Sequence, residues 1–154
     1  ICFARGTFNA HPTVMGAMSA FLDQLETPEI QALYDGLDET WNARAKHFND
    51  TMQANAIPLQ AANMSSVWTL FYTQPSRYNW MLQYYLRLHG LALSWVGTGR
   101  LIFSLNYDDA AFEAVLQKFV QACQQMQQDG WWWHTLEMSN KAIRRQILKE
   151  TLFR

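Results

Sequence analysis

A glycine and a threonine precede the first apolar helix that the sequence predicts. Gly6 and Thr7 stand a few residues before Pro12, which is placed to open that helix at its first turn. The hydroxyl of Thr7 and the backbone amides of the loop would then lie in front of a helix N-terminus, where phosphate groups commonly bind. The spacing therefore indicates a phosphate-binding loop, although many loops that lead into a helix have these residues and bind nothing.

Other chemistry-bearing residues give weaker signals. Gly97 and Gly99 flank a threonine, and a glycine turn can expose amides to an anion, but no dinucleotide or P-loop signature surrounds them, so a turn between two strands explains them better. The histidines His11, His47, His89 and His134 lack the spacing of a metal site and have no partner acid placed to orient them, so we predict surface or capping roles for most of them. No serine lies in a nucleophile-elbow motif. The two cysteines, Cys2 and Cys123, are too few for a disulfide framework.

Composition limits the class of protein. The 154 residues are 49% hydrophobic and carry a net charge of −1, which predicts one domain with a sizeable core and argues against nucleic-acid binding. No long uncharged apolar run or signal peptide is visible, so we expect a cytoplasmic protein that does not bind a membrane. The sequence begins at Ile1 without a methionine, and we expect a fragment of a longer protein.

Hydrophobic periodicity predicts the elements that must position these residues. An apolar helix is expected from Pro12 to about Leu25, and a long amphipathic helix from Pro28 to about Asn55. The polar face of the second helix, which includes Arg44, is predicted to be solvated. Further elements follow in order: a strand at Val67–Thr73, a helix from Tyr78 that closes at Gly90, strands at Leu91–Trp95 and Leu101–Leu105, and a helix capped by Asp108 or Asp109.

The last part of the chain combines three tryptophans with a basic helix. Residues 131–133 are all Trp, and because three consecutive side chains cannot all face one side, we expect one or two to pack and another to stay exposed. A short helix follows from about Ser139, and residues 139–154 contain five basic residues and one acidic residue. These features could close the core or extend into solvent. Alternatively, they could dock a partner, the basic helix against an acidic protein such as a carrier domain.

The segment Gly6-Thr7-Phe8-Asn9-Ala10-His11-Pro12, followed by an apolar helix rich in small residues, resembles a motif of the class III, fold type I pyridoxal-phosphate (PLP) aminotransferases, the group that includes glutamate-1-semialdehyde aminomutase. The later elements, through residue 130, follow the order of that family's C-terminal domain. More narrowly, the segments 75–80, 94–100, the tryptophan run and residues 139–143 resemble aminotransferase domains of hybrid polyketide and nonribosomal peptide synthetases of secondary metabolism.

The resemblance implies a fold and a division of the chain. It implies an α/β (α+β) small domain in which a small antiparallel sheet is covered by helices. Residues 1–25 would form the cofactor-phosphate loop and the helix that leads from the large domain, and residues 26–130 the C-terminal small domain. Residues 131–154 would form a tryptophan-rich segment and a basic helix or linker.

The resemblance also implies site residues. Thr7, with Gly6 beside it, would contact the phosphate of PLP held mainly by the other subunit of a homodimer. Asn9, Ala10 and His11 differ from the family's usual Ser, Gly and Asn, which leaves the neighbouring contacts open. Arg100 would pair with a substrate carboxylate, although an arginine beside a turn is as often a surface ion-pair partner.

The family's Schiff-base lysine would lie outside this chain. Lys46, Lys118, Lys141 and Lys149 fall on predicted helix surfaces or in the tail, so the fragment alone would be inactive and no catalytic residue is expected in it. The complete enzyme would transfer an amino group to a keto or aldehyde acceptor, which could be a β-ketoacyl thioester on an acyl-carrier protein. Aminomutase activity and a non-catalytic docking module, with a carrier or an adjacent synthetase domain as partner, remain the alternatives.

Overall fold

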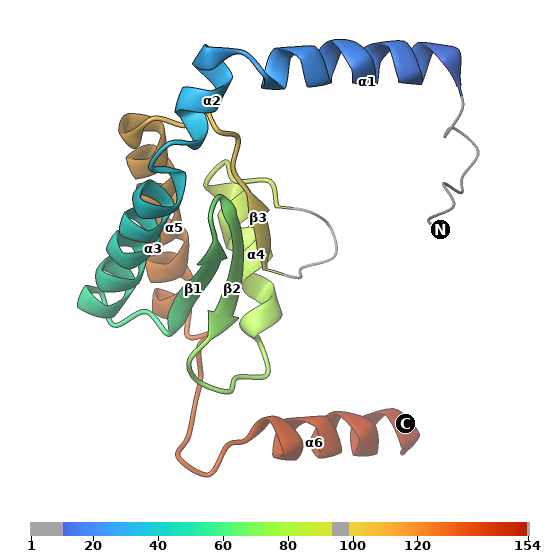
Figure 1. Ribbon diagram of the computed structural model, residues 1–154. Coiled ribbons are helices and arrows are strands. Elements are labelled where there is room, and N and C mark those ends of the chain that lie inside the picture. The colour runs from blue at the N-terminus through green and yellow to red at the C-terminus, as the bar shows by residue number, and fades with distance from the viewer. Residues whose placement is uncertain (1–10, 94–98, 154) are drawn as a thin grey trace. The chain divides into compact units, whose positions relative to one another are not determined.

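The computed structural model describes residues 11–93 and 99–153 and divides the chain into two compact units, 1–37 and 38–154 (Figure 1). The first unit contains helices α1 (Pro12–Leu25) and α2 (Pro28–Tyr34). Each begins with a proline, whose fixed φ suits the first helical position and whose missing N–H costs nothing there. The expected helix at Pro12–Leu25 is therefore confirmed. Neither α1 nor α2 contains a buried residue.

The predicted continuous helix from Pro28 to Asn55 is wrong. Helix α2 ends where Asp35 takes an extended conformation, and α3 (Leu37–Ala54) begins two residues later. Gly36 lies between them with a φ of +69°, a left-handed conformation that glycine adopts without strain. Hydrophobic periodicity continues across this break, so the pattern of apolar residues alone does not reveal it.

The second unit is built on a three-stranded antiparallel sheet in the order β1-β2-β3. Strand β1 (Leu59–Met64) joins β2 (Val67–Tyr72) through a two-residue turn in which Ser65 has a φ of +49°. Strand β3 (Arg100–Ile102) pairs with β2, with Arg100 opposite Thr69. The strand expected at Val67–Thr73 is thus confirmed.

Two predictions about the strands need correction. Residues 91–93 lie in no strand, and residues 94–98, which hold the rest of the strand predicted at Leu91–Trp95, lie outside the described part. The strand predicted at Leu101–Leu105 is shorter and begins one residue earlier, at Arg100. Its partner is β2, from which it is separated by 27 residues, so local alternation could not identify the pairing.

Helices complete the second unit. A 3₁₀ turn (Asn79–Met81) leads into α4 (Leu82–Leu88), followed later by α5 (Asp109–Gln128) and α6 (Asn140–Leu152). Asp108 caps α5 by accepting a 2.7 Å hydrogen bond from the amide of Ala111, as the sequence predicts. Gly90, with a φ of +83°, ends α4 in the left-handed conformation expected of a C-terminal glycine.

One face of the sheet packs against α3 and α5 (Figure 1). Trp68 of β2 is the centre of this core, with 1% of its surface exposed. Its ring lies 5.2–6.1 Å, between centroids, from four aromatic rings: Trp41, Phe48, Phe103 and Phe112. Helix α4 packs on α5, where the hydroxyl of Tyr85 donates to Asp129 at 2.7 Å.

The tryptophan run divides as expected. Trp132 is buried, Trp131 is half-buried with its ring 5.1 Å from Tyr78, and Trp133 is 57% exposed. The neighbouring His134 donates from Nδ1 to the carbonyl of Pro75 at 2.8 Å. The run therefore closes the core at one end. Among the described helices, none is long and apolar enough to cross a membrane.

Candidate functional site

The second face of the sheet is not covered by the helices that form the core. Because side chains alternate along a strand, the residues between the buried ones of β1, β2 and β3 share this side. All of them are exposed, and we call them the open sheet face: Gln60, Ala62, Met64, Val67, Thr69, Phe71, Arg100 and Ile102. Its apolar members include Met64 and Ile102, which are 76% and 72% exposed.

Arg100 is the one charged residue of the open sheet face. It lies on β3 directly opposite Thr69, two residues from Ile102. Within the described ranges, no hydrogen bond or ion pair engages its guanidinium group. A guanidinium on an apolar surface can bind a carboxylate through two parallel hydrogen bonds. The position therefore suits the recognition of an anionic ligand.

The strands around Arg100 carry no opposite charge. From Thr51 to Tyr107 the sequence contains no Asp or Glu, whereas it contains Arg77, Arg87 and Arg100. All three strands lie within this segment, so no carboxylate on the sheet can neutralise Arg100. The long interval without acids is a sequence signal for an anion-binding face, and a search for short motifs does not detect it.

The start of β3 is fixed by a close backbone contact. The carbonyl of Gly99 accepts a 2.8 Å hydrogen bond from the amide of Leu70, and Gly99 has a φ of +66°. A Cβ at this position would lie 2.6 Å from the Leu70 carbonyl oxygen. Gly99 therefore permits the approach that places Arg100 on the sheet. Gly97, with which the sequence pairs it in a turn, lies outside the described residues.

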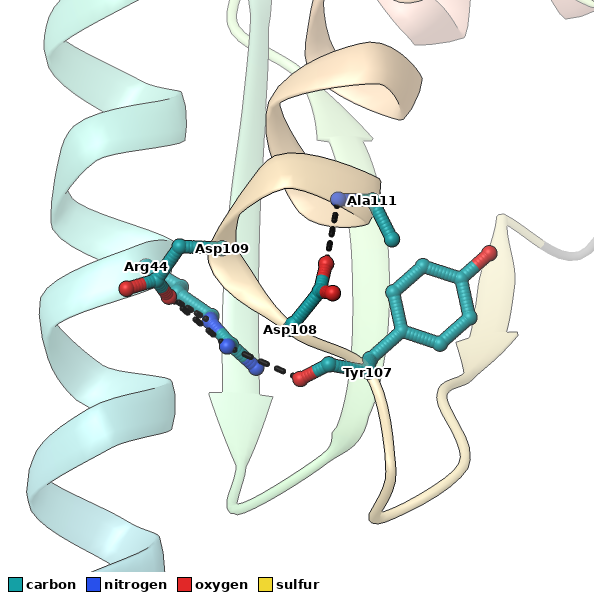
Figure 2. A network of polar contacts seen from close by, with 5 residues as sticks. All are labelled: Arg44, Tyr107, Asp108, Asp109 and Ala111. Carbon is teal, nitrogen blue, oxygen red and sulfur yellow. Dashed lines mark hydrogen bonds and ion pairs between the residues drawn. The ribbon is translucent and has the colours of Figure 1, made fainter.

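Arg44 of α3 bonds to the segment between β3 and α5 and to the start of α5, as Figure 2 shows. Arg44 Nη2 donates to the carbonyl of Tyr107 at 2.9 Å and to Asp109 Oδ1 at 2.8 Å. Its guanidinium also lies 4.6 Å from the ring centroid of Trp41 and 5.7 Å from that of Phe112. The network thus holds the segment between β3 and α5 against α3.

The sequence-based prediction that Arg44 lies on a solvated face is wrong. Its side chain is only 11% exposed. Arg44 is three residues after the buried Trp41, which places the two side chains on neighbouring positions of one helix face. That spacing is the signal that could have identified a partly buried arginine.

We expect Arg44→Ala to lower the free energy of unfolding by about 2–3 kcal/mol, because it removes a charged hydrogen bond to Tyr107 and the stacking on Trp41. Asp109→Asn is the matched control, since Asp109 is 92% exposed and the loss of an exposed ion pair costs about 0–1 kcal/mol. Urea denaturation of both variants measures the difference. Equal losses would mean that the ion pair, and not the buried guanidinium, supplies the stability.

One prediction about the histidines needs correction. His47 does have a partner acid, since its Nε2 lies 3.1 Å from Glu113 Oε2 across α3 and α5, a proximity that sequence spacing cannot reveal. His89 bonds to Gln125 at 2.8 Å, and His11 occupies the N-cap position of α1 without a side-chain capping bond. In the described ranges no three His, Cys, Asp or Glu side chains form a metal-binding group.

In the described part of the chain, each shifted pKa moves further from pH 7. Burial raises the pKa of Cys123 and of Tyr72, and burial together with the bond to Asp129 raises the pKa of Tyr85 to about 12. Hydrogen bonds from Gln117 and His47 lower the pKa of Glu113. None of these shifts produces a group that exchanges a proton near pH 7. None of the groups concerned belongs to the open sheet face.

Gly6 and Thr7 lie outside the described residues, so their role stays a prediction. Arg100 is the predicted site residue that the structure places, and it lies on the open sheet face.

Comparisons with known proteins give matches among solved structures. No model of a protein family matches the sequence, and no curated protein matches it. An omega-transaminase from Sphaerobacter thermophilus superposes with a TM-score of 0.64 at 18% identity, covering 82% of this chain and 31% of that chain. A transaminase with PLP bound gives a TM-score of 0.64 at 16% identity, covering 84% of this chain and 31% of its own.

This chain therefore spans about a third of the length of the transaminases that it matches. At these identities the likeness shows the fold. It confirms the expected α/β small domain, with its antiparallel sheet of three strands packed against helices. The chain has the fold of one part of a transaminase.

Proposed function

We propose that this chain is the C-terminal part of a PLP-dependent class III aminotransferase that acts in the cytoplasm. The observation that carries the proposal is the shared fold over 82% and 84% of the chain with two transaminases, one of them with PLP bound. The segment Gly6–Pro12 supports it independently, because a threonine before a helix N-terminus suits the phosphate of PLP.

In the proposed enzyme, Arg100 binds the carboxylate of the amino donor or of the acceptor. The guanidinium is exposed and has no counter-charge on the sheet, and the contact of Gly99 with Leu70 fixes the backbone beside it. Thr7 binds the cofactor phosphate, with Gly6 allowing close approach, at a site shared between two subunits of a homodimer. PLP, when bound, supplies the electron sink that amino transfer needs.

The positions of the lysines fit the proposal that this chain supplies binding residues and another part supplies the Schiff-base lysine. All four are on helices, Lys46 on α3, Lys118 on α5, and Lys141 and Lys149 on α6, and none belongs to the open sheet face. The Schiff-base lysine is therefore assigned to another part of the protein, and this chain by itself is expected to be inactive.

The proposed acceptor is a keto or aldehyde compound, with a β-ketoacyl thioester on a carrier protein as the specific case. Amino transfer is favoured over the aminomutase reaction, because the resemblance implies a glutamate in the aminomutase where this chain has Gly99 and Arg100. A docking module without a cofactor is the second candidate, supported by the exposed Trp133 and the basic α6.

An absorbance spectrum tests the proposal. The protein is purified at its natural length with added PLP, and the spectrum is recorded before and after addition of an amino acid donor. We expect a bound chromophore that the donor converts to the pyridoxamine form. A protein that retains no chromophore would contradict the proposal and favour the docking module.

Arg100→Ala is expected to reduce kcat/KM for a carboxylated amino donor by about 10- to 150-fold, which corresponds to a charged hydrogen-bonding interaction of about 1.5–3 kcal/mol. An amine donor without a carboxylate should be affected little, and this donor serves as the internal control. Arg87→Ala, on the exposed surface of α4, is the matched variant. Equal losses with both donors would exclude carboxylate binding by Arg100.

A further inference from the structure

An ion pair joins α6 to the segment that follows β2. Arg77, in the segment after β2, donates from Nη1 to Glu150 Oε1 at 2.7 Å and makes a second, parallel bond from Nη2 to Oε2. Hydrogen bonding to Glu150 raises the pKa of Arg77. A bidentate pair of this kind fixes direction as well as distance. The pair turns the Glu150 side of α6 toward the segment after β2 and the opposite face away from that segment.

The opposite face of α6 is basic. With 3.6 residues per turn, the side chains opposite Glu150 and the two basic side chains at their edges, Arg144 and Lys149, form one surface, which we call the basic face: Lys141, Arg144, Arg145, Leu148, Lys149 and Leu152. All six are exposed, and Leu148 and Leu152 are 57% and 68% exposed. Glu150 is the single acid in the sequence of α6 and is engaged by Arg77, so no carboxylate of the helix neutralises this face.

We propose that the basic face of α6 is a docking surface for an acidic helix of a partner protein. Four cations around two exposed leucines complement a helix that presents several Glu or Asp side chains around a small apolar centre. Opposite charges guide the encounter and set the register, and the leucines supply apolar contact. This inference goes beyond amino transfer and does not depend on the bound cofactor.

The same face is poorly suited to a lipid surface. A helix that lies in a membrane interface needs a wide apolar face with bulky side chains. On α6 the two leucines lie among the cations, whereas Ile143 and Ile147 lie on the side of Glu150, which faces Arg77. Insertion of the basic face would therefore bury few apolar side chains, and insertion of the isoleucine side would bring Glu150 toward the lipid.

The test uses a fluorescein-labelled peptide of Glu- and Leu-containing heptads, with a Gln-for-Glu peptide as its neutral control. Fluorescence anisotropy measures binding to the wild-type chain and to Arg144→Glu/Arg145→Glu. We expect the double variant to bind the acidic peptide at least about tenfold more weakly, because two attractive charge pairs become repulsive.

Two further variants separate the role of the face from that of net charge and of folding. Arg87→Glu/Lys118→Glu changes the same amount of charge on α4 and α5 and should leave binding within about threefold of wild type. Leu148→Ser/Leu152→Ser keeps every charge and should still weaken binding several-fold. Circular dichroism confirms that each variant is folded.

Three outcomes would overturn the proposal. The first is an equal loss in the Arg87/Lys118 variant, which would show a general charge effect. The second is tighter binding of wild type to phosphatidylserine vesicles than to the peptide. The third is self-association of wild type that Arg144→Glu/Arg145→Glu abolishes, measured by sedimentation velocity, which would make a second copy of the chain the occupant.

Discussion

Replacing Trp68 with alanine is expected to lower the free energy of unfolding by about 3–5 kcal/mol, the range for large aromatic residues removed from a core. Trp68 is 1% exposed, and its ring contacts aromatic side chains from both α3 and α5. Because Trp68 packs against both helices at once, a cavity there weakens all three elements. Domains commonly have only about 5–15 kcal/mol of net stability, so the variant should unfold at a much lower urea concentration.

Trp133→Ala is the matched control for Trp68. It removes the same side chain from a site that is 57% exposed, and surface substitutions commonly change stability by less than about 0.5 kcal/mol. Urea denaturation followed by circular dichroism measures both variants without relying on tryptophan fluorescence. If Trp133→Ala were the more destabilising change, the core described around β2 would be wrong.

Local signals in the sequence were sufficient for most helices. Prolines at first positions predict the starts of α1 and α2, and Asp108 and Gly90 predict a start and an end in the second unit. These residues act through their own backbone preferences or through neighbouring amides, so the sequence contains the whole interaction. The break at Gly36 was not predicted because apolar spacing continues through it, although a glycine beside an aspartate is itself a turn signal.

The strands and the site depended on contacts between distant residues. Val67–Tyr72 was predictable from its composition, but the pairing of β3 with β2 joins segments separated by the whole of α4. Separation along the chain also conceals the partners of Arg44, which are 63 and 65 residues away. Arg100 was identified as a candidate from the resemblance to a family, whereas its exposure beside apolar neighbours could be recognised only once the sheet was assembled.

The expected effect of Gly99→Ala follows from two costs at one residue. A residue with a side chain pays about 1–2 kcal/mol in the left-handed conformation, and the new Cβ would lie 2.6 Å from the Leu70 carbonyl oxygen. Backbone cannot rotate away as a flexible side chain can, so β3 must shift from β2. We expect the free energy of unfolding to fall by about 2–4 kcal/mol in total. This is the cost of the conformation plus a steric cost typical of overpacking.

Gly130→Ala separates the two costs, because Gly130 has a similar φ of +76° and its added Cβ would meet no atom within 4 Å. It should therefore lose only the conformational part, about 1–2 kcal/mol. Thermal and urea denaturation of both variants give the difference, and equal losses would show that the contact with Leu70 carries no strain. Gly99→Ala should also weaken substrate binding, because a shift of β3 displaces Arg100. In the active protein, Gly99→Ala should then weaken the use of carboxylated donors, whereas Gly130→Ala should not.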